Sequence, residues 1–137
     1  MPPRFMLDTD TCIYIRRNKP PRVTERFAAL VAGEAVVSVV SYGELRVGAE
    51  KSRWRERDLA VLEKLIAIIP VEPLPAAAAD VYGSIRAELE RRGEVIGNND
   101  LWIAAHARAS GLTLVTNNER EFRRVPGLQV ENWVAGA

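Results

Sequence analysis

Three acidic residues stand at positions from which their side chains could do chemistry. Asp8 directly follows the apolar run of residues 5–7, which we predict to be a buried strand, and Glu44 and Asp100 each stand near the start of a predicted helix. Carboxylates that are brought together repel one another, so either one takes up a proton or a cation neutralises the group. An all-oxygen set of ligands suits Mg²⁺ or Mn²⁺, which also bind phosphate oxygens and activate water. If the three acids meet, phosphodiester hydrolysis is therefore the natural reaction.

Each acid also has an ordinary structural interpretation. Asp8 could be only a polar end to its strand, and Glu44 could be only the acid of a capping box that opens a helix. Asp100 and Glu119 could merely complement the dipole of the helix that each precedes or opens. We interpret Asp10 as a helix cap rather than a ligand. No single acid is specific, and the functional hypothesis depends on the placement that they share.

Composition excludes several other kinds of site. Of the 137 residues, 47% are hydrophobic and 27% are charged, with a net charge of +1, so we expect residues 1–137 to form one globular domain. A single cysteine, Cys12, and a single histidine, His106, exclude a disulfide framework and the usual zinc and histidine-base sites. No apolar run reaches membrane-spanning length and no signal peptide is visible, so we expect a cytoplasmic protein.

The acids need a framework, and the chain alternates predicted strands with predicted helices. Strands are predicted at residues 5–7, 35–40, 68–71, 112–115 and 128–130. Helices are predicted at residues 11–16, 21–30, 41–51, 53–67 and 76–92, then from about 99 to Gly111, and at 120–124. This alternation indicates a mainly parallel α/β sandwich. Ligands bind at the carboxyl ends of the strands in such sheets, which is where Asp8 is predicted to lie.

Basic residues are mostly arginine, which accounts for 16 of the 19. Arginine binds phosphate through two parallel hydrogen bonds, as lysine cannot. Arg16 and Arg17 lie close to Asp8 in the sequence, so we take them as candidates for contact with a phosphate backbone. Residues 53–57 place three arginines around Trp54 and allow the same interpretation. For both stretches the alternative is a solvated surface.

Four short segments, in this order and spacing, resemble the PIN-domain ribonucleases, and closely the VapC toxins of toxin–antitoxin pairs. They are residues 5–9, 41–52, 96–107 and 114–122. The resemblance covers nearly the whole chain and implies a three-layer α/β/α sandwich in which Asp8, Glu44 and Asp100 are the catalytic and metal-binding acids. Thr116, in the last segment, is a further candidate for substrate contact.

The chain departs from the family's pattern at two positions. Asp10 stands where the family often has asparagine, and Asn118 stands where it often has a fourth acid. An amide is a weaker and neutral ligand, so we assign Asn118 only a secondary place in the metal site. Glu119 could replace the missing acid through a water molecule.

By resemblance, the protein would be a Mg²⁺- or Mn²⁺-dependent endoribonuclease that cuts structured RNA, with tRNA as the leading substrate class. It would form a homodimer and be silenced by a cognate antitoxin. Two other hypotheses remain at this point. Residues 7–11 could be the nucleophile motif of a haloacid-dehalogenase-like phosphatase, with Asp8 attacking phosphorus and Asp10 as acid/base. The acids could also be structural caps in a non-catalytic module that binds RNA or protein.

Overall fold

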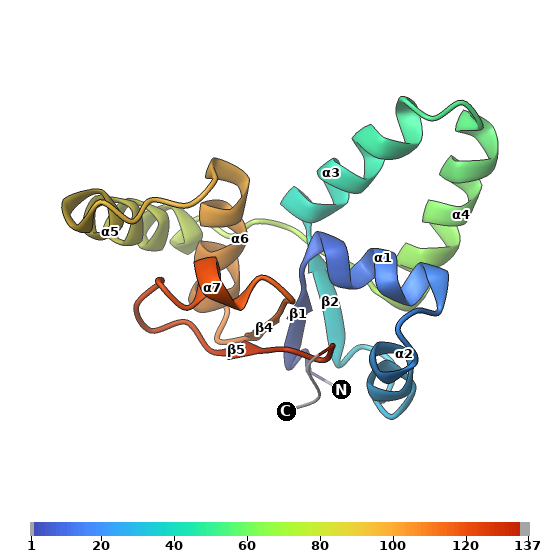
Figure 1. The fold of residues 1–137 in the computed structure, drawn as a ribbon, viewed down its shortest axis with the longest axis horizontal. Coiled ribbons are helices and arrows are strands. Elements are labelled where there is room, and N and C mark those ends of the chain that lie inside the picture. The colour runs from blue at the N-terminus through green and yellow to red at the C-terminus, as the bar shows by residue number, and fades with distance from the viewer. Residues whose placement is uncertain (1, 135–137) are drawn as a thin grey trace.

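A computed structural model describes residues 2–134 and places all strands in one parallel sheet (Figure 1). The strands are β1 (Phe5–Leu7), β2 (Ala35–Ser38), β3 (Val71–Glu72), β4 (Thr113–Val115) and β5 (Val130–Glu131), in the order β3-β2-β1-β4-β5. The helices are α1 (Thr9–Arg17), α2 (Pro21–Ala28), α3 (Val39–Glu50), α4 (Arg55–Ile68), α5 (Ala77–Arg92), α6 (Asn98–Ala109) and α7 (Glu119–Phe122). The predicted parallel α/β sandwich is confirmed.

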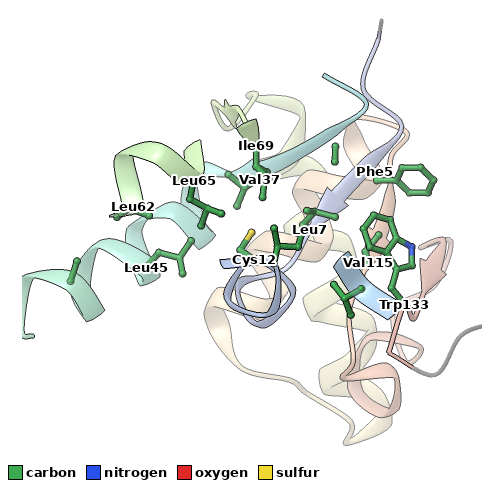
Figure 2. Packing of buried hydrophobic residues seen from close by; sticks show 14 residues of the cluster. Phe5, Leu7, Cys12, Val37, Leu45, Leu62, Leu65, Ile69, Val115 and Trp133 are labelled. Carbon is green, nitrogen blue, oxygen red and sulfur yellow. The ribbon is translucent and has the colours of Figure 1, made fainter. Parts of the chain in front are cut away.

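Two apolar cores fill the space on either side of the sheet. Because side chains alternate along a strand, Phe5 and Leu7 of β1 enter one core and Met6 enters the other. The first core packs β1 and β2 against helices α1 to α4 (Figure 2), and the second packs the sheet against α5 and α6. This arrangement gives the predicted three layers. None of the helices described in residues 2–134 is both long and apolar enough to cross a bilayer.

The order in which the chain adds strands to the sheet reverses at β1. The chain first adds β2 and β3 on one side of β1, and later adds β4 and β5 on the other side. Leu7, the last residue of β1, therefore lies between Val37 of β2 and Val115 of β4. A crevice outside the carboxyl ends of the strands forms at such a point. Asp8, the next residue, is placed at its mouth.

Two predicted helix starts are wrong. Asp10 does not cap the first helix, because Asp8 is the N-cap and Asp10 lies inside α1. The predicted capping box of residues 41–44 does not open α3, which begins at Val39 with Ser38 as its N-cap. The β-branched run of residues 35–40 favoured a longer strand. Strand β2 ends at Ser38, which pairs with Glu72 of β3, and the chain turns directly into α3 at Val39. Smaller shifts move β3 and β5 a few residues later than predicted.

A buried histidine joins the start of α3 to α6. His106 is 1% exposed, and its Nδ1 lies 2.8 Å from the hydroxyl of Ser38, which also accepts the backbone N–H of Val40. The ring also bonds the backbone of Pro73, and since proline offers only a carbonyl there, the ring donates that bond. Burial lowers the pKa of His106, so the ring is neutral and accepts from Ser38 at Nδ1. The cap of the helix that carries Glu44 is thereby tied to the helix that carries Asp100.

This arrangement predicts opposite outcomes for two neighbouring serines. Ser38→Ala removes the α3 cap and the partner of a buried ring nitrogen, so we expect a loss of about 1–3 kcal/mol in the free energy of unfolding. Ser41 is also buried, but its hydroxyl has no hydrogen-bond partner among residues 2–134. Ser41→Ala should therefore be neutral or slightly stabilising. Urea denaturation of both variants measures the difference, and equal losses would contradict the assignment of Ser38 as the cap.

Candidate active site

A cavity of about 160 Å³ opens at the carboxyl ends of β1 and β4 and brings the predicted acids together. Its lining residues are Asp8, Thr9, Asp10, Glu44, Asp100, Asn118 and Phe122. They come from the β1–α1 junction, α1, α3, α6, the β4–α7 connection and α7, several of which are far apart in the sequence. The predicted meeting of Asp8, Glu44 and Asp100 is therefore observed.

Asp8 is the most firmly held of these acids. Its backbone N–H donates to the carbonyl of Val115 at 3.0 Å, and its Oδ1 accepts the backbone N–H of Thr11 at 2.8 Å. The hydroxyl of Thr116 also hydrogen-bonds the carboxylate. The side chain is only 6% exposed, and this burial raises its pKa more than the hydrogen bonds lower it. Asp8 is thus the N-cap of α1 and presents a firmly held carboxylate to the cavity.

Glu44 reaches the cavity from the second turn of α3. One carboxylate oxygen accepts the hydroxyl of Thr9 at 2.6 Å, and the other lies 3.4 Å from the side-chain amide of Asn99. These contacts connect α3 to α1 and to the first turn of α6. Glu44 is therefore oriented toward the acids of both neighbouring helices.

Asp100 carries the clearest electrostatic signature of the site. Burial, followed by repulsion from Glu44, Glu121, Asp8 and Asp10, raises its pKa to about 6. None of the ten ion pairs among residues 2–134 involves Asp8, Glu44 or Asp100. In a chain with 16 arginines, this group of carboxylates is left without a basic partner. Such a group gains from a bound cation.

The donor chemistry fits a hard divalent cation, with one restriction. Within residues 2–134, no three His, Cys, Asp or Glu side chains are grouped tightly enough to enclose a metal ion by themselves. Mg²⁺ keeps several of its waters and needs only one or two direct carboxylate ligands. The cavity therefore suits a partly hydrated ion that Asp8 and Asp100 hold and Glu44 approaches, rather than a closed cage.

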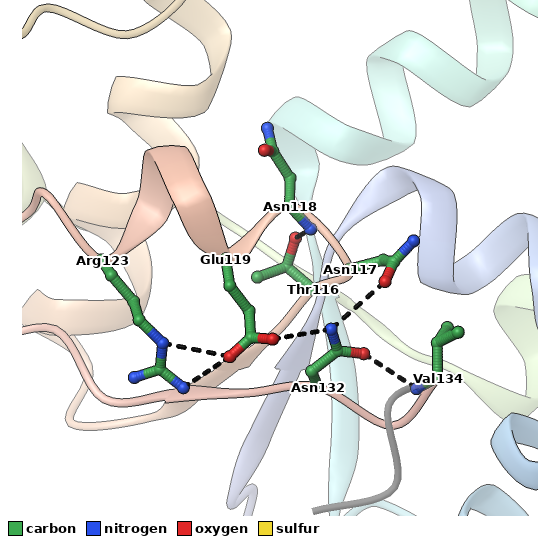
Figure 3. Close-up of polar contacts among 7 residues, drawn as sticks. All are labelled: Thr116, Asn117, Asn118, Glu119, Arg123, Asn132 and Val134. Atoms are coloured by element: carbon green, nitrogen blue, oxygen red, sulfur yellow. Dashed lines mark hydrogen bonds and ion pairs between the residues drawn. The ribbon is translucent and has the colours of Figure 1, made fainter.

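The two secondary ligand candidates differ in position. Asn118 lines the cavity, and its side-chain amide donates to Glu121 at 2.9 Å. Glu119 does not line it: its carboxylate accepts from Asn132 at 2.9 Å and from Arg123 at 2.7 Å, as Figure 3 shows. The prediction that Glu119 could replace the missing acid is therefore not supported, because these two partners hold it outside the cavity.

The residues that we predicted to contact the substrate also differ in position. Thr116 is 1% exposed, and its hydroxyl accepts the backbone N–H of Asn118 and bonds Asp8. It positions Asp8 and has no surface to offer a substrate. Arg16 lines a second hollow of about 320 Å³, which shares Thr9 and Glu44 with the acidic cavity. Arg17 is exposed but does not line either hollow.

Sequence reasoning interpreted Asp10 mainly as a helix cap and did not identify Glu121 as an acid of the site. Asp10 lines the cavity from the first turn of α1, and Glu121 lies close enough to raise the pKa of Asp100. The signal for Asp10 was its spacing, because the residue two after a strand-terminal acid faces the same crevice once the helix starts at Thr9. Glu121 lies three residues after Asn118, a helical spacing that places both on one side of α7.

A parallel sheet with a topological switch at β1 and an acidic cavity at that switch defines the chain as an α/β protein whose carboxylates meet at the carboxyl edge of the sheet. A family model described as "PIN domain" matches residues 5–128. The chain belongs to the PIN domain family and, within it, to the VapC proteins.

The similarity to named relatives and to a solved structure extends over almost the full chain. The chain is 52% identical over 130 residues to the "tRNA(fMet)-specific endonuclease VapC" of Shigella flexneri, covering 95% of this chain and 98% of that protein. It is 44% identical to "Ribonuclease VapC2" of Haemophilus influenzae, with 96% and 98% covered. The crystal structure of DNA-bound VapBC from Salmonella typhimurium superposes with a TM-score of 0.90 at 46% identity, covering 96% of this chain and 98% of that one.

Proposed function

We propose that this protein is a metal-dependent endoribonuclease toxin that hydrolyses phosphodiester bonds in structured RNA. The observation that carries the proposal is the convergence of Asp8, Glu44 and Asp100 around one cavity in which no basic residue neutralises them. Two relatives are named as endonucleases specific for tRNA(fMet), so tRNA is the proposed substrate class. The protein would act in the cytoplasm.

In this proposal each residue around the cavity has a separate role in the reaction. Asp8 and Asp100 bind a Mg²⁺ or Mn²⁺ ion, which when bound supplies charge for the phosphate oxygens and lowers the pKa of a water molecule. Glu44, held by Thr9 and Asn99, accepts a proton from the attacking water or orients it. Thr116 and the amide of Thr11 keep Asp8 in place, and Asn118 keeps Glu121 beside Asp100.

The partners follow from the relatives. Solved structures of relatives are described as VapBC bound to DNA, and VapBC-5 from Mycobacterium tuberculosis is described as a member of the VapBC family of toxin-antitoxin systems. We propose that a cognate antitoxin inhibits this protein as well, and that it acts as a homodimer. The phosphatase hypothesis loses its basis, because the family assignment explains Asp8 without a phosphoryl-enzyme.

Removal of the metal tests the proposal. Purified protein freed of antitoxin should cleave a tRNA(fMet) transcript with Mg²⁺ or Mn²⁺ present, and EDTA should lower the cleavage rate by more than about 100-fold. Adding back excess Mn²⁺ should restore it, whereas Ca²⁺, which prefers longer bonds and more ligands, should restore much less. The rate is measured from labelled RNA on a denaturing gel. Cleavage that persists in EDTA would contradict the proposed mechanism, and binding of the RNA without cleavage would favour the non-catalytic module.

A further inference from the structure

We propose that Trp54, with Arg53 and Arg57, forms a binding site for an unpaired nucleobase of the RNA substrate, away from the cleavage site. We name these residues, with Arg55 and Glu56 between them, the Trp54 tip (residues 53–57). The inference rests on the proposed function and goes beyond it by assigning a second contact with the same substrate. Figure 1 shows α3 and α4 extending together from the sheet, with the connection that leads into this tip at their far end.

Trp54 is exposed in a way that packing does not explain. Its side chain is 56% exposed, whereas Trp133 is buried at 1% and Trp102 stacks on Tyr82 with ring centroids 3.9 Å apart. The tip is nonetheless well defined. The backbone N–H of Trp54 donates to the hydroxyl of Ser52 at 2.9 Å, and that hydroxyl donates to Asp58. A large aromatic ring is therefore presented to solvent from a tightly bonded turn.

Positive charge surrounds this ring. The guanidinium carbons of Arg53 and Arg57 each lie 5.5 Å from the ring centroid. Arg57 has one ion pair, with Asp58 at 3.3 Å, and Arg53 has none among residues 2–134. Both side chains are exposed, so moving either guanidinium group from the ring to a phosphate costs little free energy. Stacking of a base on an aromatic side chain is the stronger contact of the two, so a base can take the place of a guanidinium.

Neighbouring hollows lie between the acidic cavity and the tip. The acidic cavity shares Thr9 and Glu44 with the neighbouring hollow, whose far end is formed by Ser52 and Asp58 at the base of the tip. Arg16 lies along this hollow, and a third, shallow hollow is formed by the tip itself. Glu44 and Glu50 are separated by about 9 Å along α3, so the tip contacts a different nucleotide from the one that is cut.

The positive charge of the Trp54 tip favours RNA, rather than a protein, as its binding partner. Three arginines and one acid occupy residues 53–57, and they are flanked by Ser52 and Asp58, which line the hollow next to the acidic cavity. An aromatic ring among cations is the arrangement that binds single-stranded nucleic acid, because every base has a face that can stack. The proposed ligand is therefore one unpaired nucleobase with its flanking phosphates.

Substitution of Trp54 tests the inference. We expect Trp54→Ala to raise KM for a tRNA(fMet) transcript about 5- to 100-fold, with kcat changed by less than about 3-fold, because one stacked base is lost and the acids are untouched. Trp54→Phe keeps an aromatic face and should recover most of the affinity. The double variant Arg53→Gln/Arg57→Gln should lower the slope of log Kd against log salt by about one to two. Val47→Ala, at a position 55% exposed on α3, is the matched surface control.

Binding is measured in the Asp8→Asn background, in which the RNA stays intact. The same transcript is titrated at several salt concentrations, with thermal unfolding of each variant as the check on folding. If wild-type protein cleaves the RNA and Trp54→Ala has unchanged KM and Kd, the inference is overturned and the proposed function stands. A change in the sedimenting mass of Trp54→Ala with unchanged RNA affinity also overturns it, because the tip then serves protein contacts. If wild-type protein neither binds nor cleaves RNA, both proposals fail.

Discussion

Asp8→Asn is expected to lower the rate of RNA cleavage by more than about 100-fold without unfolding the protein. The substitution removes the charge of the most buried acid in the cavity and leaves a neutral amide, which is a weaker ligand for a hard cation. Asparagine caps helices about as well as aspartate does, so the bond from the Thr11 amide and the start of α1 should survive. The expected result is a folded but inactive protein, which cleavage assays and thermal unfolding measure together.

Glu119→Gln is the matched control for Asp8→Asn. It makes the same change from acid to amide, at a carboxylate that Asn132 and Arg123 hold outside the cavity. We expect its cleavage rate to stay within about 3-fold of the wild-type rate, with a loss of at most about 1 kcal/mol in the free energy of unfolding from the exposed Arg123 contact. Equal losses of activity in the two variants would show that the acidic cavity is not the catalytic centre.

The second large effect concerns pH and Asp100. Its pKa of about 6 means that lowering the pH through 6 protonates the side chain and removes a ligand. At subsaturating Mn²⁺, kcat/KM should therefore fall about tenfold for each pH unit below 6 and level off above about 7. Asp100→Asn should lose most activity and should also lose this pH dependence. A wild-type profile that stays flat between pH 5 and pH 7 would contradict the role given to Asp100.

Stability should respond to pH in the opposite direction. Because the folded-state pKa of Asp100 lies above its usual value of 3.8, the folded protein favours the protonated form. The contribution of Asp100 to stability is therefore greatest at low pH and is lost as the pH rises through 6. Asp100→Asn should raise the Tm of the metal-free protein near neutral pH, and the gain should shrink toward pH 4. Thermal unfolding in EDTA at both values measures this change.

Much of the fold was predictable because it depends on local patterns. The short apolar run ending at Asp8 indicated a buried strand, and the alternation with amphipathic helices indicated a parallel sheet. The left-handed Gly93, with a φ of +67°, ended α5 where the sequence predicted. Asp8, Glu44 and Asp100 were predictable as a group for the same reason, since strand ends and helix starts meet at one edge of such a sheet.

The remaining errors come from tertiary contacts that local patterns do not contain. Ser41 has the side chain and spacing of a cap, but the chain leaves the sheet at Ser38, whose hydroxyl meets His106. Glu119 has the charge of a metal ligand, but Asn132, in the segment after β5, hydrogen-bonds its carboxylate outside the cavity. Thr116 and Glu121 influence Asp8 and Asp100 across contacts between segments that are far apart in the sequence.

The central claim is that carboxylates from three separate segments share one divalent cation. Calorimetric titration of Mn²⁺ into metal-free protein near neutral pH tests it most directly, because it does not depend on the RNA. We expect saturable binding to the wild-type protein and to Glu119→Gln, and an affinity at least about tenfold lower for both Asp8→Asn and Asp100→Asn. Equal Mn²⁺ affinity in all four proteins, or no saturable binding to the wild-type protein, would contradict the claim.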